Sequence, residues 1–219
     1  MRGTDGSGVR CSKDAMALRL SDTDGKLTSM PKTVPAVIAA RSLGSTPQPR
    51  IDGAGIALRP WATTDSSRLA DAFEDPAIQF WHRRTIASAV EAESLITGYA
   101  RDWAAETRAN WAVVSDTDEL LGRVSLNPMH LEDGEAEIGY WILGSARGRG
   151  VAVTAVALLT SWSFSVGFHR LIIHHSTSDP ASCAVAHRAG FELEATKKSA
   201  LLHPDGWHDI HLHARINPC

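Results

Sequence analysis

The stretch that decides the fold is Ala136-Glu-Ile-Gly-Tyr-Trp-Ile-Leu-Gly-Ser-Ala-Arg-Gly-Arg-Gly-Val-Ala152, where an apolar strand runs into a glycine-rich turn and then into a long helix. Gly148 and Gly150 remove side chains at the point where the backbone must turn sharply and approach a ligand. The N–H groups at the start of the following helix carry partial positive charge. The stretch therefore predicts a binding site for phosphate groups.

Two familiar nucleotide-binding loops do not match these residues. A dinucleotide fingerprint that starts at Gly148 requires its third glycine at Val153, and no acidic residue lies about 20 positions further on. A P-loop is excluded because no Gly-Lys-Ser/Thr follows. The remaining pattern is Arg147-x-x-Gly150-x-Ala152. It resembles the Arg/Gln-x-x-Gly-x-Gly/Ala signature of the GNAT superfamily of acyl-CoA-dependent N-acetyltransferases, in which this loop holds the pyrophosphate of coenzyme A.

Two further motifs follow the order of the same family. Residues 136–142 are similar to the fourth strand of the RimJ/RimL-like, ribosomal-protein-alanine N-acetyltransferase-type branch, which acetylates protein N-termini or related amines. Asp179-Pro-Ala-Ser182 resembles the family's Asn-x-x-Ser helix, and Gly190-Phe191 resembles the Gly-Phe that closes it. The resemblance covers residues 51–216 and implies an α/β (α+β) GNAT fold, with a central mixed, mostly antiparallel sheet flanked by helices.

Composition bounds the organisation of the 219-residue chain. This length suits one domain with a tail. Residues 1–49 are rich in Gly, Ser, Thr, Asp and Pro and lack a sustained apolar period, so we expect a mobile tail, or a translation start at Met16 or Met30. Residues 50–219 are expected to form the acetyltransferase domain.

Charge and cysteine content exclude several classes of partner. The net charge of −3 indicates no nucleic-acid partner, and no apolar run approaches the length of a membrane span. The cysteines, Cys11, Cys183 and Cys219, have neither disulfide-framework nor metal-ligand spacing. We therefore expect a soluble cytoplasmic protein without membrane contact.

Hydrophobic periodicity and turn residues place the secondary structure along the chain. Asp65 and Ser88 are expected to cap helices, and Gly190 to end one. The expected elements are strand 56–59, helices 65–73 and 89–107, an antiparallel meander of strands 111–114, 120–126 and 135–143, helix 151–166, strand 170–175, helix 182–189, and a hairpin of 191–196 with 207–214 around His203-Pro-Asp-Gly206.

The resemblance implies the coenzyme contacts. In the family the fourth and fifth strands separate and the pantetheine arm pairs with the fourth strand. The residues expected to bind acetyl-CoA are Ile142, Leu143, Arg147, Gly148, Arg149, Gly150, Val151, Ala152, Asp179 and Ser182. The side chains of Arg147 and Arg149 either add charge-assisted contacts or stay solvated. Asp179 departs from the family's asparagine, because an ionised carboxylate only accepts hydrogen bonds, and it can instead cap the helix.

Two residues are candidates for the chemistry. Glu137 occupies the position of a fourth-strand glutamate that deprotonates the amine in many GNAT enzymes, although in a Glu135-Ala-Glu137 pair it can also simply face solvent. An α-amine of pKa about 8 costs only about 1.4 kcal/mol to neutralise at pH 7, against about 4.6 kcal/mol for a lysine. Ser182 aligns with a serine near the CoA sulfur in the RimJ/RimL-like branch, and it can equally serve as a first-turn helix residue.

The remaining reactive side chains have weaker patterns. Cys183 is more typical of a core cysteine than of a covalent acyl carrier, since no cationic partner flanks it. Alternate histidines of one strand share a face, but no third zinc ligand is identifiable beside His203, His208, His211 and His213, and no metal is expected.

The sequence predicts an acetyl-CoA-dependent N-acetyltransferase that transfers the acetyl group directly to a primary amine. A protein N-terminal amine is the acceptor that the branch implies. A small amine such as an antibiotic or a polyamine is the alternative, and a non-catalytic acyl-CoA-binding module is a third. Acceptor contacts are expected from residues 75–84 and 203–208. The acyl-chain length is open, and a monomer or a homodimer is compatible with the family.

Overall fold

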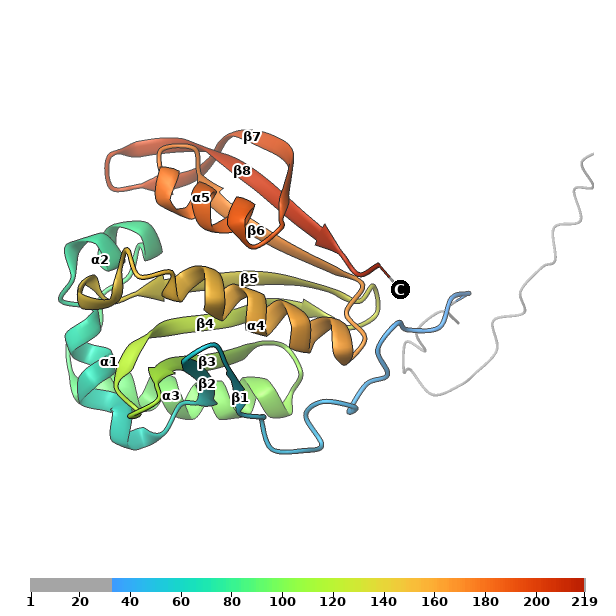
Figure 1. Ribbon diagram of the computed structural model, residues 1–219, viewed down its shortest axis with the longest axis horizontal. Helices are drawn as coiled ribbons and strands as arrows, with labels where there is room; N and C mark the ends of the chain where they lie inside the picture. The colour runs from blue at the N-terminus through green and yellow to red at the C-terminus, as the bar shows by residue number, and fades with distance from the viewer. Residues whose placement is uncertain (1–32, 219) are drawn as a thin grey trace, which may run out of the picture. The chain divides into compact units, whose positions relative to one another are not determined.

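The computed structural model describes residues 33–218, and within them eight strands form one mixed sheet in the order β1-β2-β3-β4-β5-β6-β8-β7 (Figure 1). Neighbouring strands are antiparallel except for the parallel pair β5–β6. The predicted meander and final hairpin are confirmed. The strands are β1 (Ile51–Gly53), β2 (Ile56–Pro60), β3 (Ala109–Ser115), β4 (Leu120–His130), β5 (Glu135–Ile142), β6 (Arg170–Ser176), β7 (Glu192–His203) and β8 (Gly206–Ile216).

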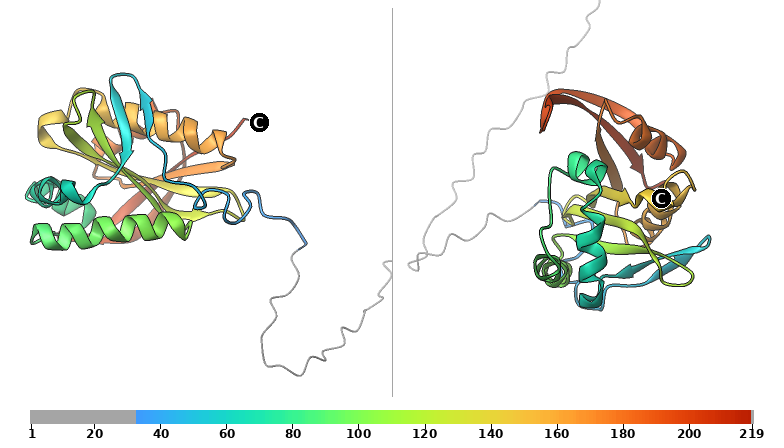
Figure 2. Two further views of the ribbon diagram at one scale, coloured as in Figure 1. Left: turned by 90° about the horizontal axis from the view of Figure 1, so that it is seen from below. Right: turned by 90° about the vertical axis from the view of Figure 1, so that its left-hand side faces the viewer.

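Helices cover both faces of the β1–β5 part of the sheet, with α4 on one side and α3 on the other (Figure 2). The α-helices are α1 (Ser66–Ala72), α2 (Pro76–His82), α3 (Ala89–Ala104), α4 (Val151–Ser165) and α5 (Pro180–Arg188), and the short 3-10 turns are η1 (Thr63–Asp65) and η2 (Gly144–Ala146). This arrangement confirms the predicted mixed sheet flanked by helices.

The alternation of side chains in β3 shows how the sheet separates two cores. Trp111 and Val113 point to the α4 side, where they belong to the larger apolar cluster with Leu159. Ala112 and Val114 point to the opposite side and pack with residues of α1 and α3. All four β3 side chains are fully buried, as expected for a central strand covered on both faces.

Local signals set most helix boundaries. Ser88 caps α3 as predicted, accepting a hydrogen bond from the Glu91 N–H at 3.2 Å. Asp65 precedes α1 but does not cap it through its side chain; its carboxylate binds the Arg59 guanidinium at 2.7 Å instead. Helix α2 was not predicted, although Asp75 caps it and proline occupies its first turn, which are ordinary start signals.

The segment before β1 differs from the expected mobile tail. Ile38 and Leu43 are buried in the larger core, and the Glu106 carboxylate at the end of α3 accepts backbone N–H bonds from Arg41, Leu43 and Gly44 at 2.6 to 2.8 Å. The composition of this stretch does not indicate that it is ordered, because its few apolar residues pack against a partner that is distant in sequence. The predictions for residues 1–32, including the alternative starts and Cys11, lie outside the described residues, as does Cys219.

One break in the sheet positions the site. The parallel pairing of β5 with β6 joins residues 135–137 to residues 170–172, and beyond these pairs the two strands diverge (Figure 1). Strand β6 instead stays paired with β8 along its whole length. In the described part of the chain, no helix has the length and apolar character needed to cross a membrane.

Candidate active site

The glycine-rich turn leads directly into α4. Gly148 and Gly150 have φ of 73° and 81°, a left-handed conformation that favours glycine, and a Cβ built on either would meet no described protein atom within 4 Å. Gly150 is the N-cap of α4 and, as a glycine, has no side chain with which to cap it. Because the first N–H groups of a helix lack intrahelical partners, this end of α4 presents donors to open space.

A cavity of about 460 Å³, here called the loop cavity, lies against this turn. Its walls come from α2, the end of β5, the turn itself and α5. It includes most of the residues expected to bind the coenzyme, whereas Leu143 and Arg149 do not line it: Leu143 packs against the smaller apolar cluster and Arg149 is exposed. The expected residues that do line it are Ile142, Arg147, Gly148, Gly150, Val151, Ala152, Asp179 and Ser182.

The Arg147 side chain is held by protein partners. Its Nη2 lies 2.6 Å from Asp75 Oδ2 at the start of α2, and its Nε donates to the Ile142 carbonyl at 3.0 Å. Such an ion pair joins α2 to the turn. The backbone N–H groups, more than this side chain, are therefore the free donors of the turn.

A second cavity of about 490 Å³, here called the strand cavity, lies on the other side of the gap between β5 and β6. Cationic groups outnumber anionic ones in its lining. The charged residues that line it are Arg83, Arg84, Arg123 and Lys197, with Glu137 and Asp179. The His203 side of the expected acceptor region also contributes, through His203 stacked on Phe80 with ring centroids 5.5 Å apart.

Glu137 lines the strand cavity and is held there by a chain of polar contacts. Its Oε2 lies 3.0 Å from His174 Nδ1, and the Lys197 ammonium lies 3.0 Å from His174 Nε2. An ammonium only donates, so Nε2 accepts and Nδ1–H donates to the carboxylate. Glu135, two residues earlier on the same face, is instead paired with Arg170 at 2.9 Å. The two glutamates therefore have different environments.

Tyr140, Asp179 and Ser182 line both cavities and mark the junction between them. Asp179 caps α5, accepting the Ser182 N–H at 3.0 Å, in agreement with the capping alternative for this residue. The Tyr140 hydroxyl donates to the Ser182 carbonyl at 3.4 Å. Burial is the main cause that raises the Tyr140 pKa to about 12, so the phenol stays protonated at neutral pH.

Sequence reasoning missed His174 and Tyr140, and it included His82 only as part of the expected acceptor segment 75–84. His174 approaches Glu137 only because β5 and β6 are paired at their starts, and Tyr140 meets Ser182 across a gap of 42 positions in sequence. His82, at the end of the unpredicted α2, lines both cavities. Burial, assisted by Arg123, lowers the His82 pKa to about 4, so this imidazole is neutral at pH 7.

A sheet that opens between two parallel strands, with a glycine-capped helix beside the opening, is the arrangement that the resemblance to acyl-CoA-dependent acyltransferases implies. Residues 56–192 match the family model described as the acetyltransferase (GNAT) domain. That match covers more than half of the chain. The protein therefore belongs to the GNAT acetyltransferase family, and the proteins similar to it include ribosomal-protein acetyltransferases, as the RimJ/RimL-like motifs indicate.

Three similar proteins illustrate this relationship. A ribosomal-protein-serine acetyltransferase of Escherichia coli (strain K12) is 36% identical over 109 residues, which are 49% of this chain and 61% of that protein. An acetyltransferase from Salmonella typhimurium that modifies the N-terminal serine of a ribosomal subunit protein aligns with a TM-score of 0.70 at 23% identity, over 77% of this chain and 99% of its own. Spermidine N-acetyltransferase from Vibrio cholerae, in complex with CoA and spermine, aligns with a TM-score of 0.68 at 18% identity. The alignment covers 75% of this chain and 97% of that protein.

Proposed function

We propose that this protein transfers an acetyl group from acetyl-CoA directly to a primary amine, with a protein N-terminal α-amine as the acceptor. The observation that carries the proposal is the meeting of two cavities at Tyr140, Asp179 and Ser182. One cavity lies beside a glycine-capped helix start and the other beside a carboxylate. A direct transfer requires two substrates whose reacting atoms meet at such a junction.

The loop cavity fits the coenzyme. The donors at the start of α4 suit a pyrophosphate, and the open space beside Gly148 and Gly150 lets a phosphate approach the backbone. Beyond Glu137, the edge of β5 that faces β6 pairs with no strand among the described residues, which suits a pantetheine arm. Acetyl-CoA supplies the thioester whose acetyl group is transferred. Because Asp75 engages Arg147, we assign pyrophosphate binding to the backbone.

Glu137 is the proposed base. Its carboxylate accepts the proton that the incoming ammonium must lose before its nitrogen can attack. Neutralising an α-amine at pH 7 costs about 1.4 kcal/mol, so a carboxylate suffices for an N-terminus. The Nδ1–H of His174 holds one carboxylate oxygen, and Lys197 fixes the tautomer of that ring. We assign His174 and Lys197 to positioning Glu137.

The leaving sulfur needs a proton, or a donor that stabilises its negative charge. Tyr140 and Ser182 are the hydroxyl groups at the junction of the two cavities. The raised pKa keeps the Tyr140 phenol protonated, and its O–H, which donates to the Ser182 carbonyl at 3.4 Å, would turn from that carbonyl to the sulfur. We assign Ser182 to the region of the sulfur, as the family resemblance implies, and add Tyr140 as a second donor that spacing in the sequence could not reveal.

The charge of the strand cavity discriminates between acceptors. Arg83, Arg84 and Arg123 line it together with Lys197, so a polycationic amine would meet repulsion. A peptide N-terminus followed by acidic residues places one amine near Glu137 and its carboxylates near these cations. The lining therefore favours an N-terminal peptide over a polyamine such as the spermine bound by the Vibrio cholerae neighbour.

The proposal also covers the domain bounds, the cellular compartment and the oligomeric state. We infer that residues 34–219 form the catalytic domain, which acts in the cytoplasm as a monomer or a homodimer.

The proposal is tested by an acceptor panel with the full chain and acetyl-CoA, following release of the CoA thiol. The panel contains a peptide with N-terminal serine followed by acidic residues, the same peptide with a blocked N-terminus, and spermidine. Turnover of the free peptide alone is expected. Turnover of spermidine but not of the peptide would show that the acceptor is a small amine instead. Coenzyme binding without turnover of any amine would indicate a non-catalytic acyl-CoA-binding module.

A further inference from the structure

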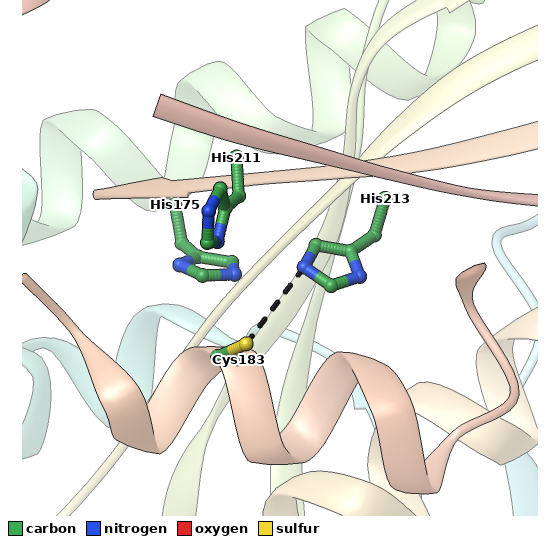
Figure 3. Close-up of side chains that lie close together, drawn as sticks. All are labelled: His175, Cys183, His211 and His213. Carbon is green, nitrogen blue, oxygen red and sulfur yellow. Dashed lines mark hydrogen bonds between the residues drawn. The ribbon is translucent and has the colours of Figure 1, made fainter. Parts of the chain in front are cut away.

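Four side chains with metal-binding chemistry meet between β6, β8 and α5 (Figure 3). They are His175 of β6, His211 and His213 of β8, and Cys183 of α5. Each offers one nitrogen or sulfur, and these four atoms all lie within 4.8 Å of one another. None of the four has a role in the acetyl transfer proposed above.

Strand register and helix packing bring these residues together. His175 and His211 are direct partners across the antiparallel β6–β8 pair, and His213 follows His211 on the same face. His175 follows His174 in β6, so its side chain points away from the Glu137 side. Helix α5 covers this face and directs the Cys183 thiol at the imidazoles (Figure 3).

Backbone carbonyls orient two of the rings. His175 Nδ1 lies 2.8 Å from the Ser176 carbonyl and His213 Nδ1 lies 3.3 Å from the Phe191 carbonyl. A carbonyl only accepts, so both Nδ1 atoms carry hydrogen and each Nε2 keeps its lone pair. His213 Nε2 lies 4.0 Å from the Cys183 sulfur. A carbonyl that fixes the far side of an imidazole is the usual second partner of a metal-ligating histidine.

Two ring nitrogens in the cluster are buried without a described hydrogen-bond partner, His175 Nε2 and His211 Nδ1. The exposed fraction is 8% for His175 and 1% for His213. A buried polar atom without a partner is destabilising, and native proteins rarely retain one without a reason. A cation bound by the lone pairs would satisfy both nitrogens at once.

We propose that His175, Cys183, His211 and His213 bind a zinc ion through three imidazole nitrogens and one thiolate. Nitrogen and sulfur donors suit zinc and related transition metals, whereas magnesium and calcium require oxygen. Four protein ligands complete a tetrahedron and leave no open position, which is the pattern of a structural site. Atoms bound to one tetrahedral zinc lie about 3.3 to 3.8 Å apart, so the cluster would contract by about 1 Å on binding.

The bound ion would fix α5 against the last strands of the sheet. Cys183 directly follows Ser182, so the same helix turn carries a metal ligand on one side and the junction of the two cavities on the other. Zinc binding is independent of acetyl transfer, and its failure would leave the proposed reaction untouched.

The test uses the untagged full chain, stripped with a chelator and titrated with Zn²⁺ alone. One zinc per chain by elemental analysis and a rise in melting temperature are expected. Cys183→Ala and His211→Ala, at half-buried positions, should each lower zinc affinity at least about tenfold. Substituting a residue that only hydrogen-bonds to a metal ligand already lowers metal affinity by about that factor. His169→Ala, at an exposed histidine just before β6, is the matched control and should bind as wild type does.

Co²⁺ provides a second readout that identifies the sulfur ligand. The cobalt-loaded chain should show a thiolate-to-metal charge-transfer band that Cys183→Ala removes and His169→Ala retains. Absence of metal binding by the folded wild type would overturn the proposal. Zinc affinity unchanged in both Cys183→Ala and His211→Ala, with native circular dichroism, would overturn it as well.

Discussion

Replacement of Glu137 by glutamine removes the proposed base while leaving its surroundings in place. The Gln Oε1 can still accept the His174 Nδ1–H that now holds the carboxylate at 3.0 Å, so the fold should be retained. General bases contribute about 10²–10⁴-fold to rate. We expect kcat at pH 7 to fall about 10²-fold, equivalent to about 2.7 kcal/mol of barrier. The deficit should narrow above about pH 8, where an α-amine is already neutral.

Glu135→Gln is the matched control for this variant. Glu135 lies on the same strand face, and its side chain is 33% exposed against 31% for Glu137, but it is paired with Arg170 rather than with His174. Its loss should cost at most about 1 kcal/mol of stability and leave kcat unchanged. Release of the CoA thiol, measured for both variants from pH 6 to 9, distinguishes the two roles. Equal rates in Glu137→Gln and Glu135→Gln would refute the reasoning.

Three further predictions follow from individual contacts. Tyr140→Phe should lower kcat about tenfold or more with little change in KM for acetyl-CoA, because it removes a proposed donor to the leaving sulfur. An unchanged kcat would exclude that role for Tyr140. Arg84→Glu should raise KM for an acidic N-terminal peptide, and the effect should shrink with added salt. The same KM in wild type and Arg84→Glu would contradict the proposed acceptor. Burial of Glu106 raises the pKa of its carboxyl, but the backbone N–H groups of Gly44, Arg41 and Leu43 outweigh this and lower it. The stability that this carboxylate adds should therefore be present above its unfolded pKa of about 4.3 and be lost as the pH falls below it. Glu106→Gln should cost about 1–3 kcal/mol at pH 7 and flatten that acid dependence in denaturant titrations.

The parts of the fold that sequence predicted depend on local or periodic signals. Trp111 to Val114 and the residues around Gly150 have patterns that a strand or a helix start requires, and the structure confirms both. Asp179 was identified as a helix cap because a carboxylate before proline has a local explanation. Gly190 ends α5 with a φ of 80°, again a property of one residue.

The parts that sequence did not predict depend on partners distant along the chain. His174 matters because it meets Glu137 across a strand pair, and Tyr140 because it meets α5. The histidines of β8 were recognised as sharing a face, but their third and fourth partners, His175 and Cys183, come from other elements at no regular spacing. Leu43 and its neighbours pack on the domain through Glu106, which composition cannot show.

The central claim is that the turn before α4 binds acetyl-CoA, and calorimetric titration of the full chain with acetyl-CoA tests it most directly. Gly150→Asp places a carboxylate where the pyrophosphate is expected. Gly55→Asp is its matched control, because Gly55 has a φ of 79°, equally open surroundings, and a place in the β1–β2 turn, which does not line the loop cavity. We predict binding by wild type and Gly55→Asp and loss of binding in Gly150→Asp. Equal binding by both variants, or no binding by the folded wild type, would contradict the account.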